Sequence, residues 1–187
     1  APLSIQEIRI AKFDAKGNDI ASESDTYIYD ASRSAFIFDN RTVSENEYFG
    51  ARAAVSRVTT ATYTADTTIA APAVSESNEL ISRDTLIGVK KTAVENTSWN
   101  RMSQATAQTL NKFVYDGMAG DFRWISEVAG TFEFEFHGFV AYSKSVTTVA
   151  ADQYDTVYTE KPDTEKLSIS REIESEMRYG RITDLVT

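Results

Sequence analysis

The sequence predicts a mainly β protein, a β-sandwich with one flanking α-helix and extended loops or arms. Serine and threonine make up about a fifth of the residues, which suits strands that keep one face in water. Two segments near the N-terminus have the pattern of hairpins, and a later segment alternates aromatic and polar residues at the strand period of two. Only three prolines and eight glycines are present, so the chain is not rich in linkers.

The length of 187 residues indicates a single domain, residues 1–187. A chain of this size buries roughly 70% of its unfolded surface and needs no disulfide or metal to fold. It has no apolar run of the roughly 18 residues that a bilayer span requires. The start, Ala1-Pro2-Leu3, lacks a basic and an apolar region, so we expect no remaining signal peptide.

Composition restricts the chemistry that the chain can perform. There is no cysteine and a single histidine, His137, which excludes disulfide frameworks, thiolate metal sites and sites with two histidine ligands. The 28 acidic and 19 basic residues give a formal net charge of −9, which repels phosphate and anionic lipid. We therefore expect no enzyme, no cofactor, no metal, no membrane partner and no sequence-specific binding to nucleic acid.

Two hairpins are expected at the N-terminus. Apolar residues spread over 5–13 precede the turn cluster 14–19, in which Gly17 can take a positive φ. The apolar triplets 27–29 and 36–38 flank a short polar segment. Each pair of strands is close enough in sequence to be joined by a tight turn.

Residues 41–79 are expected to form an extended loop or arm. Within them the stretch 55–75 is rich in threonine, small and nearly uncharged, so its β-propensity is high but it cannot fill a deep core. We expect an extended strand or a long arm there that finds its partners elsewhere. Left unpaired, such a segment is an aggregation hazard, which favours a partner edge on another subunit; an exposed loop is the alternative. The residues expected to contact the other subunit are Val58, Thr60, Thr62, Tyr63, Thr64 and Ile69.

The flanking helix is predicted over residues 97–116. Polar residues at its start can cap it, and Asp116-Gly117 can end it. Its apolar residues recur at helical spacing, which indicates a helix that packs on the sheet; a ligand groove is the less favoured interpretation. The stripe consists of Trp99, Met102, Thr106, Leu110, Phe113 and Val114.

An aromatic strand is predicted over residues 131–142, after a strand at 121–128 and a turn at Ala129-Gly130. Aromatic residues take one parity of 131–142 and polar residues take the other, so one face is expected to be buried. The predicted core consists of Trp99, Leu110, Phe113, Trp124, Phe132, Phe134 and Phe136.

Acidic residues share strand faces in two places. In 131–142, two acids lie on the face opposite the aromatic residues. In 167–179, three acids alternate with apolar residues, so a strand is favoured, although a spacing of four between some apolar residues fits a short helix almost as well. The acidic residues concerned are Glu133, Glu135, Glu172, Glu174 and Glu176.

Catalysis by these acids has little support in the sequence. Glycosidases use paired carboxylates, but usually from different elements around a cleft. His137 lies two residues from Glu135, yet no Gly-x-Ser-x-Gly elbow or phosphate-binding loop accompanies it. The acids of 152–165 match no calcium-loop spacing. A solvated strand face is the expected role of these carboxylates.

The order of elements resembles the tail tube (major tail) proteins of tailed bacteriophages. The resemblance rests on the succession of hairpins, the expected helix, and the motifs Gly-Asp-Phe-Arg-Trp and Ala-Gly-Thr-Phe-Glu-Phe-Glu-Phe-His-Gly within 120–138. It covers roughly residues 80–142 by pattern and the whole chain by architecture.

The resemblance implies homo-oligomeric rings, commonly hexameric, that stack into a hollow tube through which viral DNA is ejected. It also implies arms that bridge subunits, other virion proteins as partners, and a place in the virion after assembly in the host cytoplasm. A lumen lined by the five acids would repel DNA phosphates within about 8 Å at physiological salt and keep the duplex from adhering.

Two other classes of function remain open. One is a capsid decoration or head-tail connector protein, which is also β-rich and oligomeric. The other is a secreted carbohydrate-binding or adhesin-like sandwich, which normally exposes a cluster of tryptophan or tyrosine for stacking on sugars. Both tryptophans of this chain lie on apolar stripes, which disfavours the second class.

Overall fold

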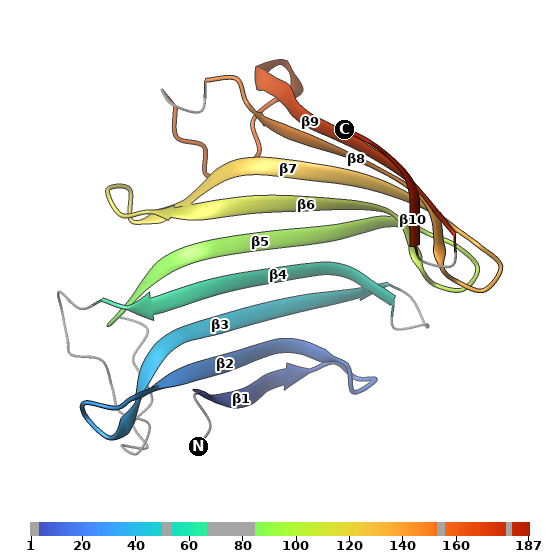
Figure 1. Cartoon of the computed structure of the whole chain (residues 1–187). Helices are drawn as coiled ribbons and strands as arrows, with labels where there is room; N and C mark the ends of the chain where they lie inside the picture. The colour runs from blue at the N-terminus through green and yellow to red at the C-terminus, as the bar shows by residue number, and fades with distance from the viewer. Residues whose placement is uncertain (1–3, 50–53, 67–84, 153–155, 179–180) are drawn as a thin grey trace.

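The computed structural model describes residues 4–49, 54–66, 85–152, 156–178 and 181–187. These residues form ten strands that run up and down in chain order and build one antiparallel sheet, β1 to β10 (Figure 1). The short helix η4, Thr164–Lys166, precedes β9. The strands are β1 Ser4–Phe13, β2 Asp19–Asp30, β3 Ala35–Phe49, β4 Ala54–Ala65, β5 Leu86–Trp99, β6 Ala105–Asp116, β7 Asp121–Phe134, β8 Val140–Ala150, β9 Leu167–Arg178 and β10 Arg181–Val186.

The protein is mainly β, as predicted, but the described strands form one layer. Each strand pairs with the next strand in the chain, from β1–β2 to β9–β10. A sandwich needs connections that cross from one sheet to another, whereas every described strand here continues the same meander. The predicted two-sheet sandwich is therefore not formed by the described strands.

The helix predicted over residues 97–116 is wrong. The segment contains the end of β5, a hairpin turn and the whole of β6. Asn100 shapes the turn, because its Oδ1 accepts a hydrogen bond from the backbone N–H of Gln104 at 3.1 Å. Leu110 and Phe113, which would share one stripe of a helix, point to opposite faces of β6.

The arm expected over residues 41–79 is also wrong where the structure describes it, because β3 and β4 take up most of that range. Three threonines of β4, Thr60, Thr62 and Thr64, point to one face, where Thr60 pairs with Ser44, while Thr59 and Tyr63 point to the other. The small, uncharged character of the segment is that of an interior strand with one hydroxyl-rich face. Five of the six residues expected to contact another subunit lie in β4, and Ile69 lies outside the described residues.

The single strand predicted over residues 131–142 is wrong as well. Strand β7 runs straight through the predicted turn at Ala129-Gly130, and the chain turns later, before β8 begins. Gly138 makes this turn with a φ of +83°, and its N–H donates to the carbonyl oxygen of Glu135 at 2.9 Å. Phe136, a predicted core residue, lies in the turn and is 93% exposed.

Other parts of the sequence interpretation are confirmed. The two N-terminal hairpins form as β1–β2 and β2–β3, and Gly17 has a φ of +83° in the first turn. Phe122 and Trp124 share a face of β7. The segment 167–179, for which strand was favoured over helix, forms β9 over its described residues.

Successive side chains in a strand point to opposite faces, so Ser24 and Asp25 mark the two faces of the sheet. We call them the Ser24 face and the Asp25 face, and follow them from strand to strand by the paired residues. The Ser24 face is rich in hydroxyl groups over β2 to β5, as in the row Ser22, Ser44, Thr60 and Thr92. The most buried strand residues other than Ser175 lie on the Asp25 face: Asp25, Tyr27, Phe38, Arg41, Ala61, Trp124, Glu127 and Ala150.

Three aromatic rings lie together on the Asp25 face, over Gly88 of β5. Phe122 makes edge-to-face contacts with Tyr63, at 5.9 Å between ring centroids, and with Tyr115, at 5.5 Å. A Cβ atom on Gly88 would lie 2.4 Å from Cδ2 of Tyr115 and 2.8 Å from Cζ of Phe122. The absence of a side chain at this position therefore lets the rings lie against the sheet.

We expect Gly88→Ala to destabilise the fold by about 1–3 kcal/mol, because the added methyl group overpacks the ring cluster. The measurement is the free energy of unfolding in urea. Gly117→Ala is the matched control, since a Cβ atom there meets nothing within 4 Å. Equal stability of the two variants would contradict the close packing over Gly88.

Candidate functional site

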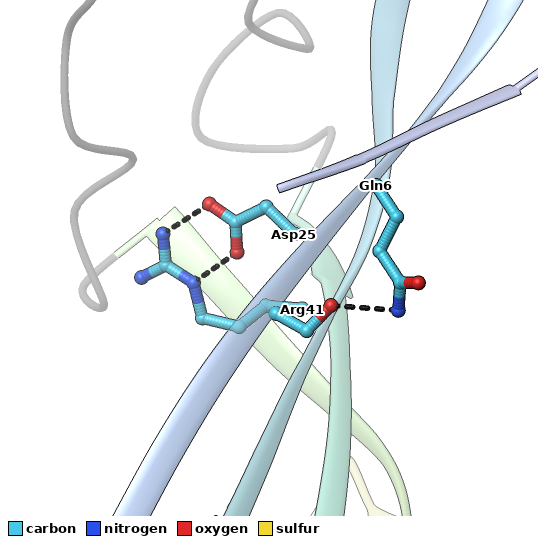
Figure 2. A network of polar contacts seen from close by, with 4 residues as sticks. Gln6, Asp25 and Arg41 are labelled. Carbon is cyan, nitrogen blue, oxygen red and sulfur yellow. Dashed lines mark hydrogen bonds and ion pairs between the residues drawn. The ribbon is translucent and has the colours of Figure 1, made fainter. Parts of the chain in front are cut away.

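A buried ion pair joins β2 to β3 on the Asp25 face. Arg41 donates from Nε to Oδ1 of Asp25 at 2.7 Å and from Nη2 to Oδ2 at 2.8 Å (Figure 2). The two side chains are 4% and 3% exposed. The hydrogen bonds from Arg41 to Asp25, and the charge of that carboxylate, raise the pKa of the guanidinium, while burial acts in the opposite direction.

The surroundings of the pair are partly aromatic. Tyr27, two residues after Asp25, packs edge-to-face against Phe38 at 5.9 Å between ring centroids. On the opposite side of the sheet, Gln6 donates to Oγ of Ser24 at 2.8 Å, and Figure 2 shows this side chain apart from the ion pair. The two polar clusters therefore belong to different faces of the same strands.

A hollow of about 310 Å³ lies beside Arg41 on the Asp25 face. It is bordered by two of the three clustered rings and by side chains of both charges. Lys91 on its border holds its Nζ 5.0 Å from the centre of the Phe113 ring. This lining offers charged groups, a hydroxyl group and two aromatic rings to a small polar molecule. The polar and aromatic residues that line it are Arg41, Glu45, Thr59, Tyr63, Lys91 and Phe122.

Removal of one member of the ion pair should be costly. We expect Asp25→Asn to lower the free energy of unfolding by about 3–5 kcal/mol, because it leaves the Arg41 charge buried without its counter-ion. The double variant Asp25→Leu with Arg41→Met should recover most of that loss, since it removes both charges and keeps apolar volume. Urea unfolding of the three proteins measures this, and a double variant as unstable as the single one would contradict the interpretation.

The connection from β8 to β9 covers Trp124. Strand β7 pairs with β8 only from Glu127 onward, so the backbone N–H of Trp124 is available and donates to the carbonyl oxygen of Tyr158 at 2.6 Å. The indole Nε1 donates to Oδ1 of Asn111 at 2.8 Å, and Trp124 is 2% exposed. Lys161 adds an ion pair to Glu127 at 2.7 Å. Residues 156–162 thus take the place beside β7 that β8 leaves open.

The start of the same connection is fixed by Asp152. Its carboxylate accepts hydrogen bonds from the hydroxyl groups of Thr156 and Tyr158, each at 2.9 Å. The bonds from Thr156 and Tyr158 lower the pKa of Asp152, and burial together with the bond to Asp152 raises the pKa of Tyr158. The hydrogen bond between Tyr158 and the Asp152 carboxylate is therefore fully formed at pH values between these two pKa values. It is lost as pH falls through the lowered pKa of Asp152 or rises through the raised pKa of Tyr158.

Four of the five predicted acids lie on the Asp25 face of β7 and β9. Glu133 pairs with Tyr142, which pairs in turn with Glu176, and Glu172 and Glu174 lie further along β9. Lys144 of β8 contacts Glu172 at 2.5 Å and Glu174 at 2.7 Å, and these two contacts raise its pKa. We call Glu133, Glu172, Glu174 and Glu176 the acidic group; it is partly neutralised by one lysine.

The remaining predicted residues are spread over the sheet. Glu135 lies in the turn after β7, near His137, and not with the acidic group. Phe113 and Trp124 lie on the Asp25 face, whereas Leu110, Phe132 and Phe134 lie on the Ser24 face. Trp99 stacks on Phe49 with ring centroids 5.0 Å apart. The structure therefore brings together the acids, but not the predicted core.

Sequence reasoning did not find Asp25 or Arg41 as a pair. A signal was present, because Asp25 has the same parity as the aromatic residues Tyr27 and Tyr29 of the same strand. A charged residue at such a position requires a buried partner. The partner could be found only with the register of β2 against β3, in which Asp25 faces Arg41.

Two kinds of feature are absent from the described ranges. No group of three or more histidine, aspartate or glutamate side chains stands close enough to hold a metal ion there. No helix among those residues is long and apolar enough to cross a membrane.

Comparison with known proteins gives no family. No protein-family model and no curated protein matches the chain. A solved structure of a protein with unknown function from Bacteroides fragilis NCTC 9343 aligns with 89% of this chain and 92% of its own, at 8% identity and a TM-score of 0.46. A likeness of that degree transfers neither fold nor function.

Proposed function

We propose that this chain is a structural, non-catalytic subunit that assembles with copies of itself. The observation that carries the proposal is the single-layer sheet. A sheet one layer thick has no second layer to cover its faces, and the chain exposes 12153 Å². A compact monomer of this mass would expose about 9,000 Å². Neighbouring copies would cover part of the difference.

The acidic group supports a more specific form of the proposal, a hollow assembly through which a polyanion passes. Acids that share one face of neighbouring strands would line a common surface in every copy. Within about 8 Å such a surface repels phosphate, which prevents adhesion of a duplex. Lys144 reduces this charge at Glu172 and Glu174, so Glu133 and Glu176 would supply most of the repulsion.

The identity that we favour is a tail tube subunit of a tailed bacteriophage, built into the virion in the host cytoplasm, with stacked rings as its assembly. Its support is the resemblance in sequence pattern and the shared acidic face. A tail tube sandwich would require a second layer over this sheet, which neighbouring copies would have to supply. A capsid decoration or connector protein is the alternative use of the same self-assembling subunit.

Negative-stain electron microscopy of the concentrated protein, with its mass in solution, tests the proposal. Rings or hollow tubes and a mass that rises with concentration are the expected result. A chain that stays monomeric at every concentration would contradict self-assembly. Discrete closed oligomers without a central channel would contradict the tube, but they would still agree with a self-assembling structural subunit.

Charge reversal tests the role of the acidic group. We expect assemblies of Glu133→Lys with Glu176→Lys to retain duplex DNA at low salt and to release it at high salt, because the repelling charge has become attractive. Asp163→Lys with Glu165→Lys is the matched control, since these exposed acids lie in the connection before β9. Co-sedimentation of DNA is the measurement, and equal retention by both variants would contradict an acidic inner surface.

A further inference from the structure

The two outermost strands of the sheet each have one open edge. Among the described strands β1 pairs with β2 alone, and β10 pairs with β9 alone. Their outer backbone N–H and C=O groups can therefore pair with another strand. Figure 1 shows β1 at one side of the sheet and the last strands at the other, with the whole sheet between them.

The directions of the two edge strands make them complementary. In a meander with an even number of strands, the first and last strands run in opposite directions. A copy placed beside β10 with its own β1 in contact would therefore continue the antiparallel pattern without a break. Strand β1 is regular over Ser4–Ile10, seven residues, and β10 spans six residues with one register shift between Ile182 and Asp184, so the lengths match to within one or two residues.

The side chains at the two edges are complementary as well. Ile8 of β1 lies on the Ser24 face and is 66% exposed. Ile182 and Leu185 of β10 lie on the same face and are 61% and 53% exposed. Exposed edge strands usually carry charges that block pairing, and these two edges have some, because β1 contains Glu7, Arg9 and Lys12 and β10 contains Arg181 and Asp184. On the Ser24 face, however, both edges present large exposed apolar residues to the same side.

We infer that β10 of one copy pairs with β1 of the next, so that the sheet continues from copy to copy, with Ile8 against Leu185 across the junction. The inference rests on the proposed self-assembly and names the surface that makes it. Such a contact joins two different surfaces, so it repeats head to tail. It closes into a ring if the rotation between copies allows, and otherwise forms a filament.

Engineered thiols test the junction, because the natural chain has no cysteine. One variant carries Ile8→Cys and a second carries Leu185→Cys, and a short thiol cross-linker is added to each alone and to their mixture. We expect cross-linked pairs of chains in the mixture and essentially none in either variant alone. Ala31→Cys, exposed in the turn between β2 and β3, is the control and should cross-link to neither.

Four outcomes would overturn the inference. Pairs formed by Ile8→Cys alone would mean that β1 meets β1. Cross-links within one chain of a variant that carries both Ile8→Cys and Leu185→Cys would mean that the two edges belong to the same copy. If the mass in solution shows oligomers but the mixture gives no cross-links, the contact lies elsewhere and the proposed self-assembly still holds. A chain that stays monomeric would contradict both the junction and the self-assembly.

A charge at the junction gives a second test. We expect Ile8→Lys to lower association at least tenfold, because a lysine would face the apolar residues of β10, while circular dichroism keeps the β signal. Val114→Lys is the matched control, an exposed apolar residue on the Ser24 face of the interior strand β6. Unchanged association of Ile8→Lys by sedimentation would contradict the junction.

Discussion

The ten described strands share one layer, and the rest of the described structure depends on that constraint. In a two-layer protein a side chain is buried by a second sheet or a helix. In the described part of this chain it is buried by its neighbours in the sheet and, near Trp124 and Glu127, by residues 156–162 beside β7. The most protected groups are accordingly those with specific partners on the Asp25 face: Asp25 with Arg41, the rings over Gly88, and Trp124 under residues 156–162.

Register shifts give the layer its shape. Each of the nine pairings, from β1–β2 to β9–β10, contains at least one shift. A bulge adds twist and bends a strand, and the strands in Figure 1 are strongly bent. In β7 the shift leaves Ile125 without a partner, beside the Trp124 N–H that donates to Tyr158. The irregular positions thus help to fix the segment that covers the Asp25 face.

The same shifts limit what could be predicted from the sequence. Parity correctly predicted that Glu172, Glu174 and Glu176 share a face, because β9 is regular over them. It did not keep Ile169 and Ile173 on one face, since a shift lies between them. Nothing local in the sequence marks such a shift, because it depends on the partner strand.

Helical spacing was misleading for a related reason. Leu110 and Phe113 are three residues apart, a spacing that a helix places on one stripe and a strand on two faces. In a single layer both faces of an interior strand are partly covered by neighbours, so apolar residues occur at both parities. The β-branched residues of this segment, Thr97, Thr106, Thr109 and Val114, favour a strand, and that local preference was the better guide.

The negative net charge of the chain opposes the approach of one copy to another, so it matters where two copies would make contact. Each copy carries a formal charge of −9, so copies repel one another at a distance. Backbone pairing at a sheet edge acts only in contact, and salt screens charges over about 8 Å. An edge with apolar residues and few acids is therefore the part of the surface where approach costs least. Ile8 on β1 and Leu185 on β10 lie at such edges, whereas the acidic group lies on the Asp25 face of β7 and β9. In the assembly that we propose, association through the edges would keep the strongest repulsion out of the contact, and that charge would stay on a face of the assembly.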